Sequence, residues 1–531
     1  MKTTQLSVNP EKLINNLRFS FTQSTTVLGE LMQNARRAGA KFVNFEYVED
    51  TRTLTVCDDG CGITCLKTLL TVAESGWDVE VIEREHPFGL GFLSAIFACD
   101  AISVDSKGGR FSVGTAELLA FQPIVIEPAD WQGITRLTLT QFKPEADRIE
   151  SQLRRLARGF PIEVRLNGVS LDRPRALNST LPFIETELGD LYLYGLSQSE
   201  DWLRQSECFH LYLQGLPVYH SHHERDPGHV IHLDSIRFFA RLPDRDKLID
   251  EAQVIAEVKH VLQREARQRL EAIKNQLSAG DFVQGYDTLK TYRCLDLLND
   301  VPLLPKQVLA TIQDYPIKEG YSTVNLAAVS QPVSQSDVEN GLVKVADLDD
   351  LDEVGALRWM FAWHRDYRVF RPSLDSRHWL FTYLVDLNAP EITLDIINVT
   401  NRAFFEGQWV NGQAVFCEQY RLTLNGESVD IDNDAVYDED QDRFIVPGRE
   451  SSGMVVGQAS SYHDEWDTFM ESAKEADEWD FQNFVVANTA DKPADALQRL
   501  LPIFGSCAAL FSKTFQLTLG DNGEVIAVAE I

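Results

Sequence analysis

A carboxylate and a carboxamide stand four residues apart in GELMQNARRAGA, residues 29–40. Leu31 and Ala35 contribute to an apolar stripe along this segment, so the pattern predicts a helix. Side chains at i and i+4 lie one turn apart on the same face. If that face is buried, Glu30 and Asn34 need a polar ligand or partner, because burying polar groups without hydrogen bonds costs free energy. If it faces water, the segment is an ordinary amphipathic surface helix.

Two glycine-containing segments follow in the chain. DDGCGI (58–63) comes directly after a predicted strand, and PFGLGF (87–92) leads into a predicted short helix. Either segment alone is a weak signal, since a lone GxG is found in many turns. Their order and their placement on a post-strand turn and a loop-to-helix junction make a joint signal with the helix. The plainer alternative is that Asp58 stabilises a turn and that Gly89 and Gly91 form a simple helix entry.

The elements that must position these segments mix helices and strands. Period-two alternation predicts a strand pair over 42–60, a hairpin over 101–116 and a further strand over 133–142. Helical segments lie between them. This combination is typical of a layered α+β domain, which we assign to residues 1–142.

A second and a third region follow. Residues 143–278 combine helices with a strand pair turning at Asn167-Gly168, further strands that include SIRFFARL (235–242), and a long closing helix over 250–278. We assign this stretch to a second, α/β domain. Residues 279–531 mix helices and strands with acidic loops, and we assign them to an α+β C-terminal region of unknown function.

Taken together, Glu30-x-x-x-Asn34, DDGCGI and PFGLGF resemble the motifs of the GHKL ATPases. This superfamily includes gyrase B subunits, histidine kinases, the large heat-shock chaperones and the MutL mismatch-repair proteins. The resemblance is specific over residues 20–140 and looser over 143–278, and it does not reach the rest of the chain. It implies a Bergerat-type α/β sandwich followed by a transducer-like domain, in a layout closest to the chaperone and MutL types.

The resemblance also implies roles for residues at the base end of a bound nucleotide. Asp58 would accept a hydrogen bond from the exocyclic amine of adenine. Gly60 and Gly62 would let the backbone approach the base closely. Thr135, in GITRL, matches the threonine that helps to fix adenine through water, although threonine is also common in ordinary strands.

A second set of implied roles concerns the phosphates. Asn34 would offer a carbonyl oxygen to Mg²⁺, and Glu30 would accept a proton from the water that attacks the γ-phosphate. Gly89 and Gly91 would open a helix whose free N–H groups face the phosphates. ATP and Mg²⁺ are therefore the implied ligands.

The second domain is expected to supply a basic residue. ARLPDRDKLID (240–250) resembles the MutL segment that carries a cation to the γ-phosphate, with Arg245 as the first candidate and Lys247 as the second. The alternative is that both are surface residues that precede or cap the next helix and have no catalytic role. The chain also departs from the family pattern, with His86 where the glycine box often begins with glycine and with Arg37 where an acidic residue is frequent.

The amino-acid composition limits the classes of partner that the protein is expected to bind. The net charge is −31, and residues 331–531 alone carry −22, which disfavours binding to nucleic acid through a broad basic surface. The sequence shows no membrane-spanning apolar run and no signal-peptide core at its N-terminus, and its eight cysteines are too sparse for a disulfide scaffold. We therefore expect a cytoplasmic protein.

The predicted function is a Mg²⁺-dependent ATPase that works as a nucleotide-gated dimeric clamp on a protein client or in signalling. One alternative is a DNA-processing ATPase of the MutL or gyrase type, and another is an ATP-binding scaffold without turnover. A histidine cluster suggests a metal site, but its spacing favours a polar loop; it comprises His220, His222, His223 and His229. Tryptophans in the acidic part are expected in the core or at a partner surface.

Overall fold

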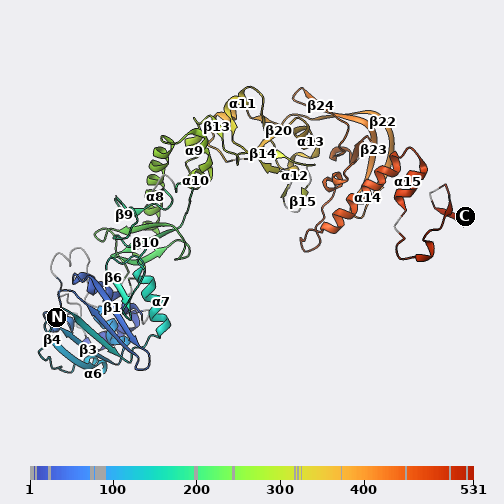
Figure 1. The fold of residues 1–531 in the computed structure, drawn as a ribbon. Helices are drawn as coiled ribbons and strands as arrows, with labels where there is room; N and C mark the ends of the chain where they lie inside the picture. Colours follow the sequence, from blue (N-terminus) through green and yellow to red (C-terminus); the bar gives the residue numbers. More distant parts are fainter. Residues whose placement is uncertain are drawn as a thin grey trace, which may run out of the picture. The chain divides into compact units, whose positions relative to one another are not determined.

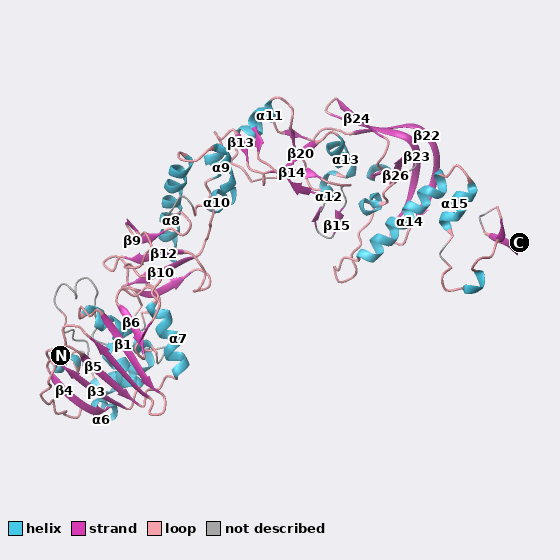
Figure 2. Ribbon diagram, viewed as in Figure 1, coloured by secondary structure: helices cyan, strands magenta, loops and turns pink. Residues whose placement is uncertain are grey.

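The protein has a mixed α+β fold, which confirms the predicted class (Figures 1 and 2). The computed structural model describes the 531-residue chain except for residues 1–4, 6–8, 22–24, 72–76, 78–90, 197–200, 242–244, 316–317, 320–321, 324–325, 372, 449–450, 502–503 and 522–523. The chain divides into two compact units, Met1–Cys294 and Leu295–Ile531. Each unit is described by itself.

A seven-stranded sheet forms the first part of unit 1. Its strands lie in the order β4-β3-β5-β2-β1-β6-β7. In that order they span Gly109–Gly114, Ala101–Ser106, Thr135–Thr140, Thr53–Asp58, Phe42–Val48, Glu163–Leu166 and Val169–Ser170. The sheet therefore continues past residue 142, because β6 pairs in parallel with β1.

Helices cover one face of this sheet (Figure 2). The helices of this part are α1 (Pro10–Leu17), α2 (Thr26–Arg37), α3 (Leu66–Leu69), α5 (Gly91–Ala98), α6 (Thr115–Leu119) and α7 (Ala146–Ala157). Apolar residues of α2, α5 and α7 share one buried cluster with alternate residues of the strands, such as Phe45 and Leu139. The opposite positions of β1 are more exposed. Period-two alternation in the strands and helical periodicity in α2 thus produce a two-layer domain.

A five-stranded sheet completes unit 1, in the order β11-β10-β12-β9-β8. Its strands span Leu216–His220, Phe209–Leu213, His229–Leu233, Gly189–Tyr192 and Ile184–Thr186. The helices α8 (Glu251–Lys274), α9 (Ala279–Phe282) and α10 (Tyr286–Thr291) follow. The ring of Phe282 stacks on Trp202 at a centroid distance of 5.8 Å, so residues beyond 278 belong to this packing.

Over its described residues, 235–241, the predicted strand at 235–242 is wrong apart from an isolated bridge between Ala240 and Leu248, and the strand that the sheet uses is β12. The side chain of Asp234 accepts a hydrogen bond from the Ile236 N–H (3.0 Å), and its carbonyl accepts from the Phe238 N–H (3.0 Å). A local turn therefore replaces an extended chain directly after β12. The sequence pattern did not predict β12, because its two histidines, His229 and His232, gave the segment a polar composition although the strand is fully buried.

Unit 2 has its own hydrophobic core around Trp359 and Phe444. One sheet runs β17-β14-β20-β19-β21, over Leu326–Ala328, Leu309–Ile312, Tyr367–Phe370, Lys344–Asp347 and Val385–Asp386. The other runs β22-β23-β26-β25, over Thr393–Glu406, Asn411–Leu424, Arg443–Pro447 and Val436–Asp438, with β24 (Glu427–Ile431) beside β23. Its helices are α11 (Gln335–Glu339), α12 (Leu351–Val354), α13 (Ala356–His364), α14 (Glu471–Thr489) and α15 (Pro493–Leu500).

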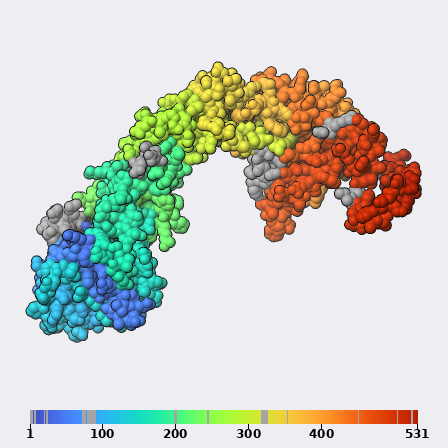
Figure 3. Space-filling view, in the orientation of Figure 1, coloured from blue at the N-terminus to red at the C-terminus, as the bar shows by residue number. Residues whose placement is uncertain are grey.

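The smaller strand pairs of unit 2 are β13 with β18, β15 with β16, and β27 with β28. They span Leu303–Leu304, Val333–Ser334, Lys318–Glu319, Ser322–Thr323, Phe515–Leu519 and Val525–Glu530. The C-terminal residues, red in Figure 3, lie at the surface, and no described side chain from 493 onwards is buried. Of the tryptophans, Trp359 is in the core, whereas Trp466 and Trp479 are exposed.

Candidate functional site

The helix α2 buries polar residues as well as apolar ones. Val27, Leu28 and Met32 pack into the core, while Glu30 is only 8% exposed and Gln33 only 1%. The basic residues of its last turn, Arg36 and Arg37, interact favourably with the negative, C-terminal end of the helix dipole. The solvated-helix alternative therefore does not describe Glu30, whose carboxylate sits inside the fold.

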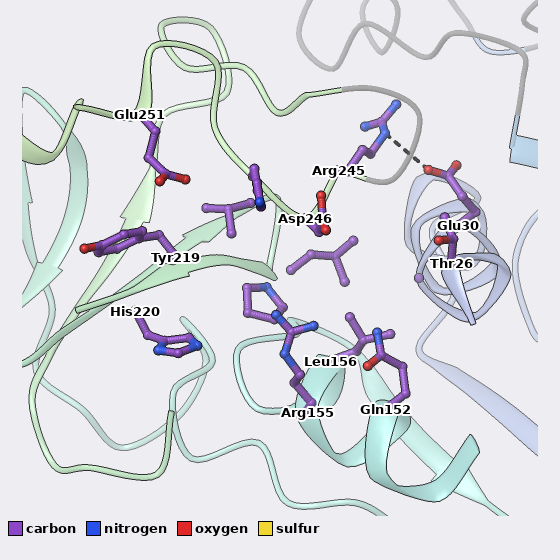
Figure 4. A pocket seen from close by; sticks show the side chains of 15 residues that line it. Thr26, Glu30, Gln152, Arg155, Leu156, Tyr219, His220, Arg245, Asp246 and Glu251 are labelled. Carbon is purple, nitrogen blue, oxygen red and sulfur yellow. Dashed lines mark ion pairs between the residues drawn. The ribbon is translucent and has the colours of Figure 1, made fainter. Parts of the chain in front are cut away.

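The Glu30 carboxylate contacts two elements that are far apart in the sequence. Its Oε1 forms an ion pair with Nε of Arg245 at 3.3 Å (Figure 4). Its Oε2 lies so close to Gly91 that a Cβ there would be 2.4 Å away. Gly91 is the first described residue of α5, so the carboxylate lies beside the first described turn of this helix. Any side chain at Gly91 would displace it.

The base end of the predicted site is built at the end of β2. Asp58 lies opposite Thr135 of β5 in the register of the sheet. Its Oδ1 accepts a hydrogen bond from the Gly60 N–H at 2.9 Å. Burial raises the pKa of this carboxyl group above its usual range, against the lowering effect of the Gly60 bond. The adjacent Asp59 has a different task, because its Oδ1 accepts from the N–H groups of residues 41 and 42.

The glycine turn packs directly on the C-terminal end of α2. A Cβ on Gly60 would lie 2.5 Å from the Cβ of Ala38 and 2.9 Å from its carbonyl oxygen. The Ala38 carbonyl accepts a hydrogen bond from the Cys61 N–H at 2.9 Å. One helix therefore touches both ends of the predicted site, the turn after Asp58 through Ala38 and the start of α5 through Glu30.

Two residues of this region were missed by the sequence reasoning. Ser106, which is fully buried, shares a hydrogen bond with the Thr135 hydroxyl (2.9 Å) and accepts one from the Ile63 N–H (2.8 Å). Trp131 lies against Gly62, where a Cβ would be 2.8 Å from its ring. Both contacts join segments distant in sequence, and neither residue belongs to a local motif that could have signalled it.

The second part of unit 1 reaches α2 through Arg245 and Gln214. Arg245 has a left-handed backbone, with φ 55°, and its side chain is 11% exposed. Its Nη1 donates to Oε1 of Gln214 at 3.3 Å. Gln214 is at the tip of the β10–β11 hairpin, and its carbonyl accepts a hydrogen bond from the Gln33 side chain at 2.9 Å. Lys247, the other basic candidate, is exposed.

A cavity of about 500 Å³ adjoins the Glu30–Arg245 ion pair. Residues of α2, α7, β11 and the segment 245–251 line it (Figure 4). Lys247 is one of the lining residues. Asp58 and Thr135 do not line it. The cavity is therefore beside the predicted phosphate end of the site and away from the base end.

The structure thus gathers the predicted residues into two groups. Glu30, Gly91 and Arg245 meet at one carboxylate, and Asn34 lies one helical turn after Glu30 on α2. The second group, around the turn after β2, contains Asp58, Gly60, Gly62 and Thr135. Gly89 and His86 lie outside the described residues.

Comparison with protein-family models gives no match for this chain, and comparison with curated proteins gives none either. Over the described ranges, no helix is both long enough and apolar enough to cross a bilayer. In the same part of the chain, no three His, Cys, Asp or Glu side chains are grouped so that they could hold a metal ion. The histidines at 220–229 therefore form no such group. The function is inferred from the arrangement of the side chains around Glu30 and Asp58.

Proposed function

We propose that unit 1 binds ATP with Mg²⁺ and hydrolyses it, in the manner of the GHKL ATPases that its motifs resemble. The observation that carries this proposal is the position of α2. Its buried Glu30 carboxylate lies against Gly91 at the start of α5, and its Ala38 end lies against the glycine turn beside Asp58. A nucleotide needs such a pair of sites, one for its base and one for its phosphates.

At the base end, Asp58 is an acceptor for the exocyclic amine of adenine. Its carboxylate is partly buried and has a backbone donor in Gly60, so a further donor from a ligand would be favourable in this setting. Guanine presents a carbonyl at the equivalent position and would meet a repulsive acceptor. We therefore propose selectivity for ATP over GTP.

At the phosphate end, the close approach of Gly91 to Glu30 fits a phosphate cradle on the N-terminus of α5. Asn34 would be the protein's ligand to Mg²⁺, an ion that commonly keeps waters and substrate phosphates as its other ligands and so needs no larger cluster of side chains. When bound, the ion would neutralise phosphate charge. Glu30 would accept the proton of the attacking water, and Arg245 would offset charge that develops during transfer.

ATP binding without turnover is the second candidate function. It is favoured by the ion pair between Glu30 and Arg245, because a carboxylate oxygen engaged by a guanidinium group is not available to contact an attacking water. Action as a homodimeric clamp on a protein client is proposed in either case. A DNA-processing role is disfavoured by the net charge of −31.

Calorimetry with ATP and GTP tests the proposal. The wild-type chain should bind ATP in the presence of Mg²⁺ and prefer it to GTP. Asp58→Asn should weaken ATP binding by about 1.5–3 kcal/mol, the usual contribution of a hydrogen bond to a charged group. The matched control is Asp130→Asn, at an exposed position. Equal ATP affinity in the wild-type and Asp58→Asn proteins would refute the assignment of the base site.

A further inference from the structure

The tip of the β10–β11 hairpin is held firmly against its surroundings. Gln214 and Gly215 both have left-handed backbones, with φ 53° and 82°, which is typical of a tight two-residue hairpin turn. A Cβ on Gly215 would lie 2.6 Å from Cδ of Pro161, so the tip has little room to move. The almost fully buried Gln33 of α2 donates to the Gln214 carbonyl. These contacts at the tip are all made by backbone atoms of residues 214 and 215.

The Gln214 side chain contacts two guanidinium groups. Its Oε1 accepts hydrogen bonds from Nη1 of Arg245 (3.3 Å) and from Nη2 of Arg37 (3.5 Å). Arg37 is in the last turn of α2, and Arg245 belongs to the segment that reaches Glu30. A neutral acceptor between two cations keeps both side chains in place without neutralising either.

Arg245 is consequently held on two edges of its guanidinium group. Nε lies 3.3 Å from Oε1 of Glu30 in an ion pair that lacks hydrogen-bond geometry, and Nη1 donates a hydrogen bond to Gln214 at 3.3 Å. The guanidinium group is planar and rigid, so two contacts determine the plane in which it lies. The ion pair with Glu30 alone would not fix this plane, because it is not a directional hydrogen bond.

We propose that Gln214 is a positioning residue that sets the orientation of Arg245 at the Glu30 carboxylate. This inference rests on the proposed ATPase function. Gln214 acts through Arg245 and does not itself touch the reacting atoms. A group that is misplaced by a fraction of an ångström loses much of its effect on a transition state and little of its effect on ground-state binding. Loss of the Gln214 side-chain acceptor should therefore lower kcat and leave ATP affinity nearly unchanged.

Gln214→Met isolates the acceptor, because methionine has a similar length and cannot accept these hydrogen bonds well, while the backbone bond from Gln33 remains. We expect kcat for ATP hydrolysis to fall about tenfold and the calorimetric Kd for ATP to change less than about twofold. Gln214→Glu keeps an acceptor oxygen and should restore kcat toward the wild-type value. Gln276→Met, at an exposed position, is the matched control and should behave as the wild type.

A double-mutant cycle with Arg245→Met decides whether the effect passes through Arg245. If it does, adding Gln214→Met to Arg245→Met should produce no further loss of kcat. Two losses that multiply would overturn the inference, and so would a Gln214→Met protein with wild-type kcat. If the wild-type protein hydrolyses ATP and the Gln214→Met protein has the same kcat, only this inference is refuted and the proposed ATPase stands. A wild-type protein that does not bind or hydrolyse ATP refutes the proposed ATPase and this inference with it.

Discussion

Acidification should destabilise unit 1 through two buried histidines in β12. His229 is 1% exposed; its Nδ1 accepts from the Tyr194 N–H (3.1 Å), so its Nε2–H points to the Ser206 carbonyl (3.0 Å). Nε2 of His232 bonds the Arg175 carbonyl at 2.7 Å. Burial lowers the pKa of both side chains from 6.5 to about 4. Both are therefore neutral in the folded protein at pH 5, although they would be protonated in the unfolded chain.

The sign and size of the effect follow from this difference. Between pH 4 and 6.5 the unfolded chain binds more protons than the folded one, so the free energy of unfolding falls as the pH falls through this window. At pH 5 each histidine should contribute a loss of about 2 kcal/mol relative to neutral pH, or about 4 kcal/mol for the pair. Acidic groups with a pKa of about 2, such as Glu163, lose their contribution only at lower pH.

Hydrogen exchange of the amides at 229–233 provides a local assay, after correction for the pH dependence of the intrinsic exchange rate. The free energy of opening should decline between pH 7 and pH 5, and the decline should be smaller in His229→Gln and His232→Gln. The exposed His222→Gln should keep the wild-type slope. If all four proteins show the same dependence on pH, the buried histidines are not responsible and the reasoning is refuted.

Three further predictions concern the site and the limits of unit 1. Glu30→Ala should retain ATP binding but lose about 10²–10⁴ in hydrolysis rate, whereas Asn34→Ala should also lose affinity; phosphate release and ATP titration separate them, and near-normal values in both would contradict the assignment. Gly91→Ala should push the Glu30 carboxylate aside and lower kcat with little change in melting temperature, unlike Gly280→Ala, whose new Cβ would meet no atom closer than the Ser278 hydroxyl oxygen at 3.9 Å. A fragment ending at 294 should unfold more cooperatively in urea than one ending at 278, because only the longer one keeps Phe282 on Trp202; identical transitions would place the boundary earlier.

Local patterns were sufficient to predict several elements. The apolar spacing in residues 29–40 predicted α2, and alternation predicted β1 and β2 and the β3–β4 hairpin. Asn167-Gly168 correctly predicted a tight turn, and both residues have positive φ, 49° and 79°. These features depend on interactions between near neighbours, which a single sequence contains.

Features that depend on distant partners could not be predicted in this way. The buried strand β12 contains His229 and His232, whose polarity is satisfied by carbonyl groups of residues 206 and 175. Nothing in the sequence near Gln214 indicates that it lies between two arginines. Arg245 was named as a candidate for its position before a long helix, but its contact with Glu30 spans more than two hundred residues. Tertiary packing supplies these partners, and it is absent from the local pattern.

Because α2 contacts both ends of the proposed site, its length would determine how the site distinguishes nucleoside diphosphates from triphosphates. Glu30 and Ala38 are eight residues apart, which corresponds to a rise of about 12 Å along a helix. A single rigid element therefore fixes the separation between the glycine turn and the start of α5, and no loop intervenes that could stretch or contract. On the proposed assignment, a nucleoside diphosphate anchored at Asp58 would end short of Glu30. Inserting one residue between Glu30 and Ala38 would rotate one end of the site by about 100° relative to the other, so α2 should tolerate substitutions far better than changes of length.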